Sequence, residues 1–95
     1  MTIREFQQRI EAIYFEKDRR RGLAEDFGWL VEEVGELSRA LRRGEREEMA
    51  GEFADVLAWL CTLASIAGVD LEQAAAAKYA GGCPKCGRGP CACPA

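Results

Sequence analysis

The sequence contains no histidine among its 95 residues. No imidazole is present to serve as a general base or metal ligand, so carboxylates or thiolates must carry any such chemistry. An excess of basic residues is also missing. The net charge is −3, with acidic and basic side chains interspersed, which argues against a protein that binds nucleic acid polymers.

Long apolar runs are absent as well. None approaches the roughly 20 residues that a membrane-spanning helix needs. Residues 2–18 are rich in charge, whereas a secretory signal peptide contains an apolar stretch. The sequence therefore predicts a cytoplasmic protein with no membrane partner.

Helical periodicity is what the sequence does contain, and no stretch alternates as a β-strand does. The apolar spacing predicts helices at about residues 3–17, 23–43, 46–67 and 71–80. We predict an all-α fold, with an antiparallel four-helix bundle in residues 1–80. A short cysteine-rich tail follows in residues 81–95.

Local signals support these boundaries. Thr2 and Glu5 match a capping box, and Asp70 is a good cap for the last helix. Gly44 follows a cluster of arginines and predicts the stop of the second helix. The basic segment at residues 18–22 breaks the apolar pattern, so we expect a connector there.

Apolar stripes run along the second and third predicted helices, and we expect them to be buried. Cys61 lies in the third and is interpreted as core packing. A chain this short buries a modest core, so self-association as a homodimer or homotetramer is expected. The stripe residues are Leu23, Phe27, Leu30, Val34, Leu37 and Leu41, then Met49, Phe53, Val56, Leu57, Leu60 and Ala64.

Acidic residues form an i,i+3 pair on each of these two helices. At 100° per residue, Glu33 and Glu36 leave their stripe on the same rotational side as Glu52 and Asp55 leave theirs. In an antiparallel pair the four carboxylates converge at matching heights. Such a cluster is unfavourable without a cation, and oxygen-only ligation suits Mg²⁺ or Mn²⁺ rather than zinc. The alternative is a solvated acidic face.

The same residues resemble a known motif, E-E-x-x-E followed after a gap by E-x-x-D. It stands here as "EEVGE" (32–36), fifteen intervening residues, and "EFAD" (52–55). In this the chain resembles the MazG-like all-α nucleoside triphosphate pyrophosphohydrolases, and the similarity covers about residues 1–80.

The resemblance implies hydrolysis of a nucleoside triphosphate to a monophosphate and pyrophosphate. It also implies that Glu33, Glu36, Glu52 and Asp55 bind Mg²⁺, with Glu32 near a second metal or the attacking water. Because the chain has no histidine, a carboxylate such as Glu32 is the candidate general base.

Basic residues are candidates for binding the substrate phosphates. Lys17, Arg19 and Arg21 precede the motif helix, and Lys78 resembles the family's late phosphate-contacting lysine. The alternative for each is a solvated surface charge.

Two tryptophans lie on the same flank as the acids. At 100° per residue, Trp29 and Trp59 fall one turn beyond the carboxylates, at similar heights. A nucleobase could stack there; the alternative is packing at a subunit interface or against the first helix.

The tail segment "CPKCGRGPCAC" holds four cysteines within eleven residues. C-P-x-C-G is typical of a zinc knuckle, and C-x-C supplies two further thiolates. We predict a zinc site formed by Cys83, Cys86, Cys91 and Cys93, remote from the acidic cluster; free or redox-active thiols are the alternative. The role of the tail stays open among clamp, partner contact and tether.

Two other functions compete with a nucleoside triphosphate pyrophosphohydrolase. One is a relative that acts on phosphoribosyl-ATP. The other is a catalytically silent helical module whose acids bind metal only for structure. The presence of all five acidic motif residues, Glu32 included, argues against the second.

Overall fold

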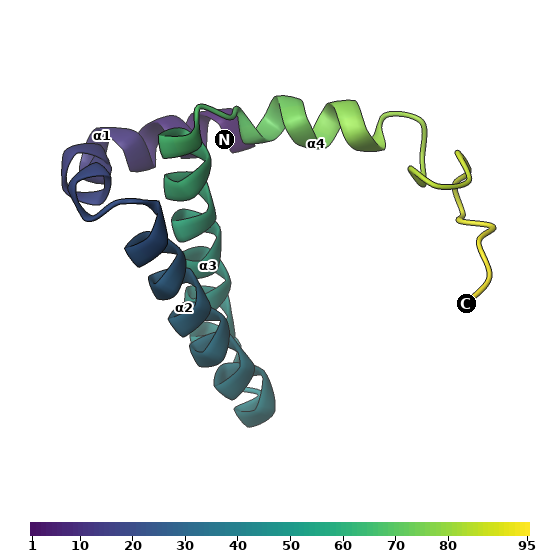
Figure 1. Ribbon diagram of the computed structural model, residues 1–95. Helices are drawn as coiled ribbons and strands as arrows, with labels where there is room; N and C mark the ends of the chain where they lie inside the picture. Colours follow the sequence, from purple (N-terminus) through teal and green to yellow (C-terminus); the bar gives the residue numbers. More distant parts are fainter.

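The computed structural model describes residues 1–95 and contains four helices and no strand (Figure 1). The all-α prediction is confirmed. The second and third helices have the predicted bounds, and the fourth ends at Tyr79. The helices are α1 (Ile3–Arg21), α2 (Leu23–Arg43), α3 (Arg46–Ala67) and α4 (Leu71–Tyr79).

Helix termini carry the expected caps. Thr2 and Glu5 form the reciprocal capping box, and the Asp70 side chain accepts a hydrogen bond from the backbone N–H of Gln73. Gly44 and Gly68 end α2 and α3 in the left-handed conformation, with φ of 73° and 77°. A side chain would strain the backbone there, so these stops follow directly from the sequence.

The prediction of a connector at residues 18–22 is wrong. Helix α1 continues through Arg21, and Gly22 alone, with φ of 90°, turns the chain into α2. Asp18 and Arg21 are one helical turn apart and form an ion pair, which favours continued helix over a loop.

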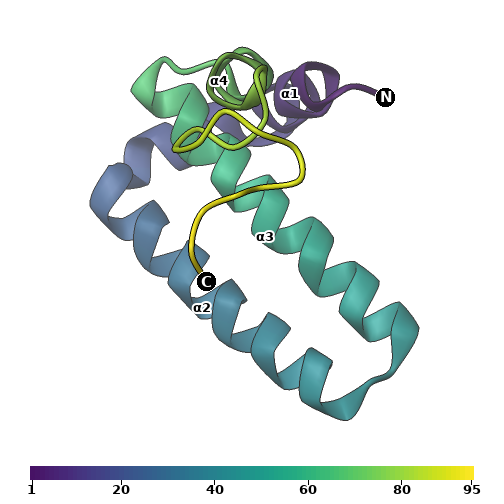
Figure 2. The ribbon, with the colours of Figure 1, turned by 90° about the vertical axis from the view of Figure 1, so that its right-hand side faces the viewer.

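Helices α2 and α3 form a long antiparallel pair, as predicted, and α1 packs mainly against α3 (Figures 1 and 2). Helix α4 extends away from this pair and carries the tail outward (Figure 1). The radius of gyration is 15.5 Å, whereas a compact chain of this length is expected near 12 Å. The fold is therefore an α2–α3 pair with two further helices across one end.

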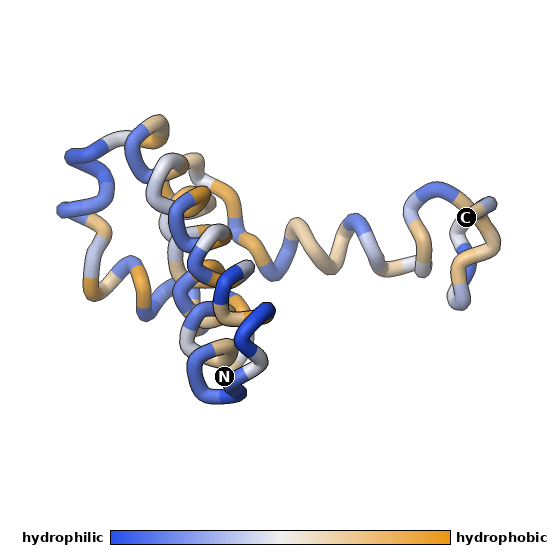
Figure 3. Tube along the Cα trace, turned by 90° about the horizontal axis from the view of Figure 1, so that it is seen from below, coloured by the Kyte–Doolittle hydropathy of each residue, from blue (hydrophilic) through white to orange (hydrophobic).

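The expectation that both apolar stripes are buried is wrong for a single chain. Phe27 on α2 is 57% exposed and Phe53 on α3 is 56% exposed, and apolar positions recur along the projecting α4 as well (Figure 3). Helix α4 has only nine residues and does not cover the α2–α3 pair. The other exposed stripe residues are Leu23, Val34, Leu41, Leu57 and Leu60. Cys61, in contrast, is fully buried, as predicted.

Gln7 joins α1 to the turn between α3 and α4. Its Nε2 donates to the Ser65 hydroxyl at 3.1 Å and to the Val69 carbonyl at 2.8 Å, and its Oε1 accepts from the Leu71 N–H at 2.9 Å. Outside this buried side chain, Arg4 forms ion pairs with Asp70 and Glu72 at the start of α4. These contacts set the direction in which α4 leaves the molecule.

Helix α3 is long and apolar enough to cross a membrane, judged by length and composition only. One such helix is a weak indication of a membrane span. In this structure it is paired with α2 and carries Glu52 and Asp55.

Candidate active site

Three carboxylates meet between the paired helices. Glu33 of α2 and Glu52 and Asp55 of α3 each bring one oxygen to within 4.8 Å of the others. Their rotational positions on two antiparallel helices place them on the same flank, as the sequence predicts. Such a distance lets a single cation contact all three.

The electrostatics of this triad favour a bound cation. The pKa of Glu33 is raised above its ordinary value, first by burial and then by the negative charges of Asp55, Glu52 and Glu36. Glu52 Oε2 is buried and has no hydrogen-bond partner. A buried acceptor without a donor, beside two more carboxylates, fits a hard, oxygen-binding cation such as Mg²⁺ or Mn²⁺.

The other two motif acids lie outside the triad. Glu36 is half-buried one turn beyond Glu33, and Arg39 approaches it at 3.4 Å. Its charge still acts on Glu33. Glu32 is exposed at the edge of the cluster.

A cavity of about 230 Å³ opens beside the triad, between α1 and α3. Asp55 belongs to both, so a ligand in the cavity would reach the carboxylates directly. Tyr14 and Lys17 line it from α1, and Trp59 and Thr62 line it from α3.

Arg21 is held in the lining of this cavity by two buried aspartates. Its Nε donates to Asp26 Oδ1 at 2.8 Å, and its Nη2 donates to Asp18 Oδ1. The hydrogen bond to Asp26 is the main cause that raises the pKa of Arg21. Asp18 also accepts from the Thr62 hydroxyl at 2.8 Å. Arg21 thus lines the cavity, but its charge is already paired with Asp18 and Asp26.

This buried cluster was not foreseen from the sequence. Asp18 lies within the predicted connector, and Asp26 belongs to no recognisable sequence motif. The i,i+3 spacing of Asp18 and Arg21 was the one local signal. Sequence spacing gives no sign that Thr62, 44 residues later, completes the network.

The two tryptophans stack on each other. Their ring centroids are 6.3 Å apart and their planes differ by 18°. The Arg21 guanidinium lies 5.3 Å from the centre of the Trp59 ring. Trp59 lines the cavity and Trp29 does not, so Trp29 supports its neighbour from outside.

The remaining basic candidates lie away from the cavity. Arg19 is exposed and pairs with Glu16. Lys78 lies in the last turn of α4, which extends away from the α2–α3 pair (Figure 1).

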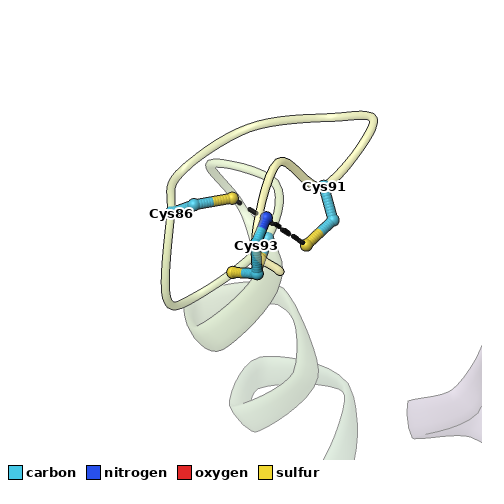
Figure 4. A group of neighbouring side chains, drawn as sticks. Cys86, Cys91 and Cys93 are labelled. Atoms are coloured by element: carbon cyan, nitrogen blue, oxygen red, sulfur yellow. Dashed lines mark hydrogen bonds between the residues drawn. The ribbon is translucent and has the colours of Figure 1, made fainter. Parts of the chain in front are cut away.

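The four tail cysteines form a second cluster, with all sulfurs within 4.8 Å of one another. Cys83 and Cys93 sulfurs are 3.8 Å apart, and those of Cys86 and Cys91 are 3.9 Å apart. Figure 4 shows Cys86, Cys91 and Cys93 converging. Four sulfurs at 2.3 Å from one zinc ion are separated by about 3.8 Å in tetrahedral geometry.

The tail backbone stabilises thiolates. The N–H of Ala92 points to Cys86 Sγ at 3.3 Å, and that of Cys93 points to Cys91 Sγ at 3.4 Å. Such backbone donors lower the pKa of Cys86 to about 6. The pKa of Cys93 is raised to about 11 by the neighbouring sulfurs of Cys91, Cys83 and Cys86. A bound cation would displace the thiol protons and hold all four sulfurs as thiolates.

Gly82 is required where the tail begins. Its φ is 98°, and an added Cβ would lie 2.8 Å from the backbone carbon of Arg88. The same backbone segment carries the hydrogen bond from the Cys83 N–H to the Arg88 carbonyl, at 2.9 Å. Glycine thus permits the bend that brings the cysteines together.

The family model for the MazG nucleotide pyrophosphohydrolase domain matches residues 22–87, more than two thirds of the chain. The chain belongs to the MazG nucleotide pyrophosphohydrolase family. The match spans the triad, both tryptophans and α4, and it includes the first two tail cysteines. No curated protein matches the chain.

Within this MazG chain, α1 lies before the matched residues. Lys17, Asp18 and Arg21 therefore belong to the part that the family match leaves out, although all three line the cavity. Members of the family generally depend on a divalent metal, which agrees with the buried, unpartnered Glu52 oxygen of the triad.

Proposed function

We propose that this protein is a Mg²⁺-dependent hydrolase that converts a (deoxy)nucleoside triphosphate to its monophosphate and pyrophosphate. The observation that carries the proposal is Asp55, which belongs both to the carboxylate triad and to the adjoining cavity. Family membership supports the reaction class.

Glu33, Glu52 and Asp55 would hold Mg²⁺, with Glu36 beside them. The ion would supply charge neutralisation on the polyphosphate and would polarise the phosphorus centre. A water oxygen bonds to the α-phosphorus as the bond to the β-phosphate oxygen breaks and pyrophosphate leaves. Glu32, exposed beside Glu33, accepts the proton of that water.

Lys17 is the basic residue of the cavity best placed for the phosphates. It is exposed and makes no ion pair, whereas Arg21 is committed to Asp18 and Asp26. We assign phosphate binding to Lys17 and a structural role to Arg21.

The test is pyrophosphate release from a panel of canonical and modified nucleoside triphosphates, with Mg²⁺ and with EDTA. We expect release with Mg²⁺ and none with EDTA. Phosphoribosyl-ATP belongs in the panel, because turnover of it alone would favour the related activity. Failure on every substrate, with metal bound, would favour the silent helical module.

We also propose that the exposed apolar face of α2 and α3 pairs with a second copy of the chain. Phe27, Val34, Phe53 and Leu60 are all more than 40% exposed, and burying such side chains is strongly favourable. Sedimentation equilibrium should show a dimer or tetramer at micromolar concentration. A monomer at all concentrations would contradict this.

The tail cysteines are proposed to bind one Zn²⁺ per chain, as expected in a reducing cytoplasm. Elemental analysis should find one zinc ion per chain, and Cys86→Ser should abolish it. Cys61→Ala is the matched control and should retain zinc, because Cys61 is buried in α3 far along the chain. Two disulfides in freshly purified protein, without zinc, would contradict the proposal.

A further inference from the structure

The floor of the cavity between α1 and α3 is formed by two buried polar side chains. Asp18 is 4% exposed and Thr62 is 6% exposed. Thr62 follows Asp55 by seven residues on α3, which places it about 10 Å further along the helix axis. A nucleotide with its phosphates at the triad would thus direct its base toward Thr62. This step rests on the proposed function.

The hydrogen-bond polarity of this floor is fixed. The one hydroxyl proton of Thr62 is donated to Asp18 Oδ2, at 2.8 Å. Arg21 donates to Asp18 Oδ1 and is itself anchored by Asp26, which is fully buried. Asp18 is therefore held between two donors and cannot turn away. Thr62 Oγ1 has only lone pairs left, and the carboxylate has only lone pairs at all.

A base that reaches this floor must donate a hydrogen bond. Cytosine and adenine present an exocyclic amino group, whereas uracil and hypoxanthine carry a carbonyl oxygen at the corresponding position. Uracil N3–H and hypoxanthine N1–H can also donate, but using them brings the adjacent carbonyl oxygen against the same two acceptors, lone pair against lone pair. The wall of the cavity suits a planar ring, because Tyr14 lines it from α1 and Trp59 from α3.

We propose that Thr62, oriented by Asp18, selects (deoxy)nucleoside triphosphates whose base carries an exocyclic amino group over their keto counterparts. Thr62 is then the specificity-determining residue and Asp18 a positioning residue. Arg21 fixes the orientation of Asp18 through its hydrogen bond to Asp18 Oδ1.

The test compares kcat/KM for dCTP with dUTP, and for dATP with dITP, in Mg²⁺. We expect a preference of about tenfold or more for the amino base in each pair. Thr62→Val combined with Asp18→Asn removes both acceptors from the floor, so the preference for the amino base should be lost. Thr62→Ser keeps the hydroxyl and should retain it. Equal kcat/KM values in the wild type would overturn the inference.

Asp18→Asn gives a sharper readout. Arg21 requires an acceptor, so the amide oxygen should face Arg21 and the amide nitrogen should donate to Thr62. The Thr62 proton is then free to point into the cavity, and the preference should shift toward dUTP and dITP. A variant that turns over both pairs in the wild-type ratio would contradict the positioning role. Far-UV circular dichroism checks that the helices remain.

Binding measurements separate this inference from the proposed function. Calorimetry with dCTP and dUTP, in Ca²⁺ instead of Mg²⁺, reports the preference even when nothing is hydrolysed. Tighter binding of dCTP without turnover in Mg²⁺ would support the selection and overturn the proposed reaction. Equal affinities would overturn the selection alone. Sensitivity to the sugar hydroxyl with none to the base would also overturn it, by placing the sugar at Thr62.

Discussion

Asp55→Asn should lower pyrophosphate release by at least about a hundredfold while leaving the helices intact. Asp55 contributes an oxygen to the triad and lines the cavity, so in the proposed function its charge lies where metal and substrate would meet. It is exposed and makes no hydrogen bond or ion pair, so its replacement removes little folding energy. Initial rates of release at saturating Mg²⁺ measure the effect.

Glu47→Gln is the matched control for this prediction. Glu47 is also exposed on α3, lies outside the triad and forms no ion pair. The activity of the Glu47→Gln variant should stay near that of the wild type. Mg²⁺ should raise the melting temperature of the control and should raise that of Asp55→Asn much less. Normal Mg²⁺-dependent turnover by Asp55→Asn would remove Asp55 from the metal site.

Arg21→Leu should destabilise the protein by about 3–5 kcal/mol, the largest stability effect that we expect of any single substitution. The change leaves Asp18 and Asp26 buried without their shared cation, and Asp26 is fully buried. It also removes the guanidinium that lies 5.3 Å from the centre of the Trp59 ring. Urea unfolding at a fixed protein concentration measures the loss.

The control for Arg21 lies two residues earlier on the same helix. Arg19 pairs with Glu16 in solvent, with exposed fractions of 57% and 68% for the two side chains. Arg19→Leu should change the free energy of unfolding by no more than about 0.5 kcal/mol. Equal unfolding midpoints for the two variants would show that the buried cluster adds no net stability.

The positions of the helices follow from local signals in the sequence. The left-handed backbone at the ends of α2 and α3 favours glycine, which Gly44 and Gly68 supply, and Asp70 provides a side-chain cap for α4. These helix ends therefore depend on single residues. The convergence of Glu33, Glu52 and Asp55 likewise follows from helical rotation and one short turn. Both are properties of a helix and its nearest neighbour.

The features that the sequence could not give depend on contacts between distant residues. Asp18, Arg21 and Thr62 meet only because α1 packs on α3, and the basic run looks like a solvated connector without that packing. The exposure of Phe27 and Phe53 has a similar origin. Periodicity identifies an apolar face, but it does not say whether the same chain or a second copy covers it.

Product analysis tests the central claim most directly. The wild-type protein is incubated with Mg²⁺ and a nucleoside triphosphate that it turns over, and the phosphorus-containing products are identified by ³¹P nuclear magnetic resonance. The proposed function predicts nucleoside monophosphate and pyrophosphate in equal amounts, and no products in EDTA. Nucleoside diphosphate with inorganic phosphate, or hydrolysis that persists in EDTA, would contradict the account.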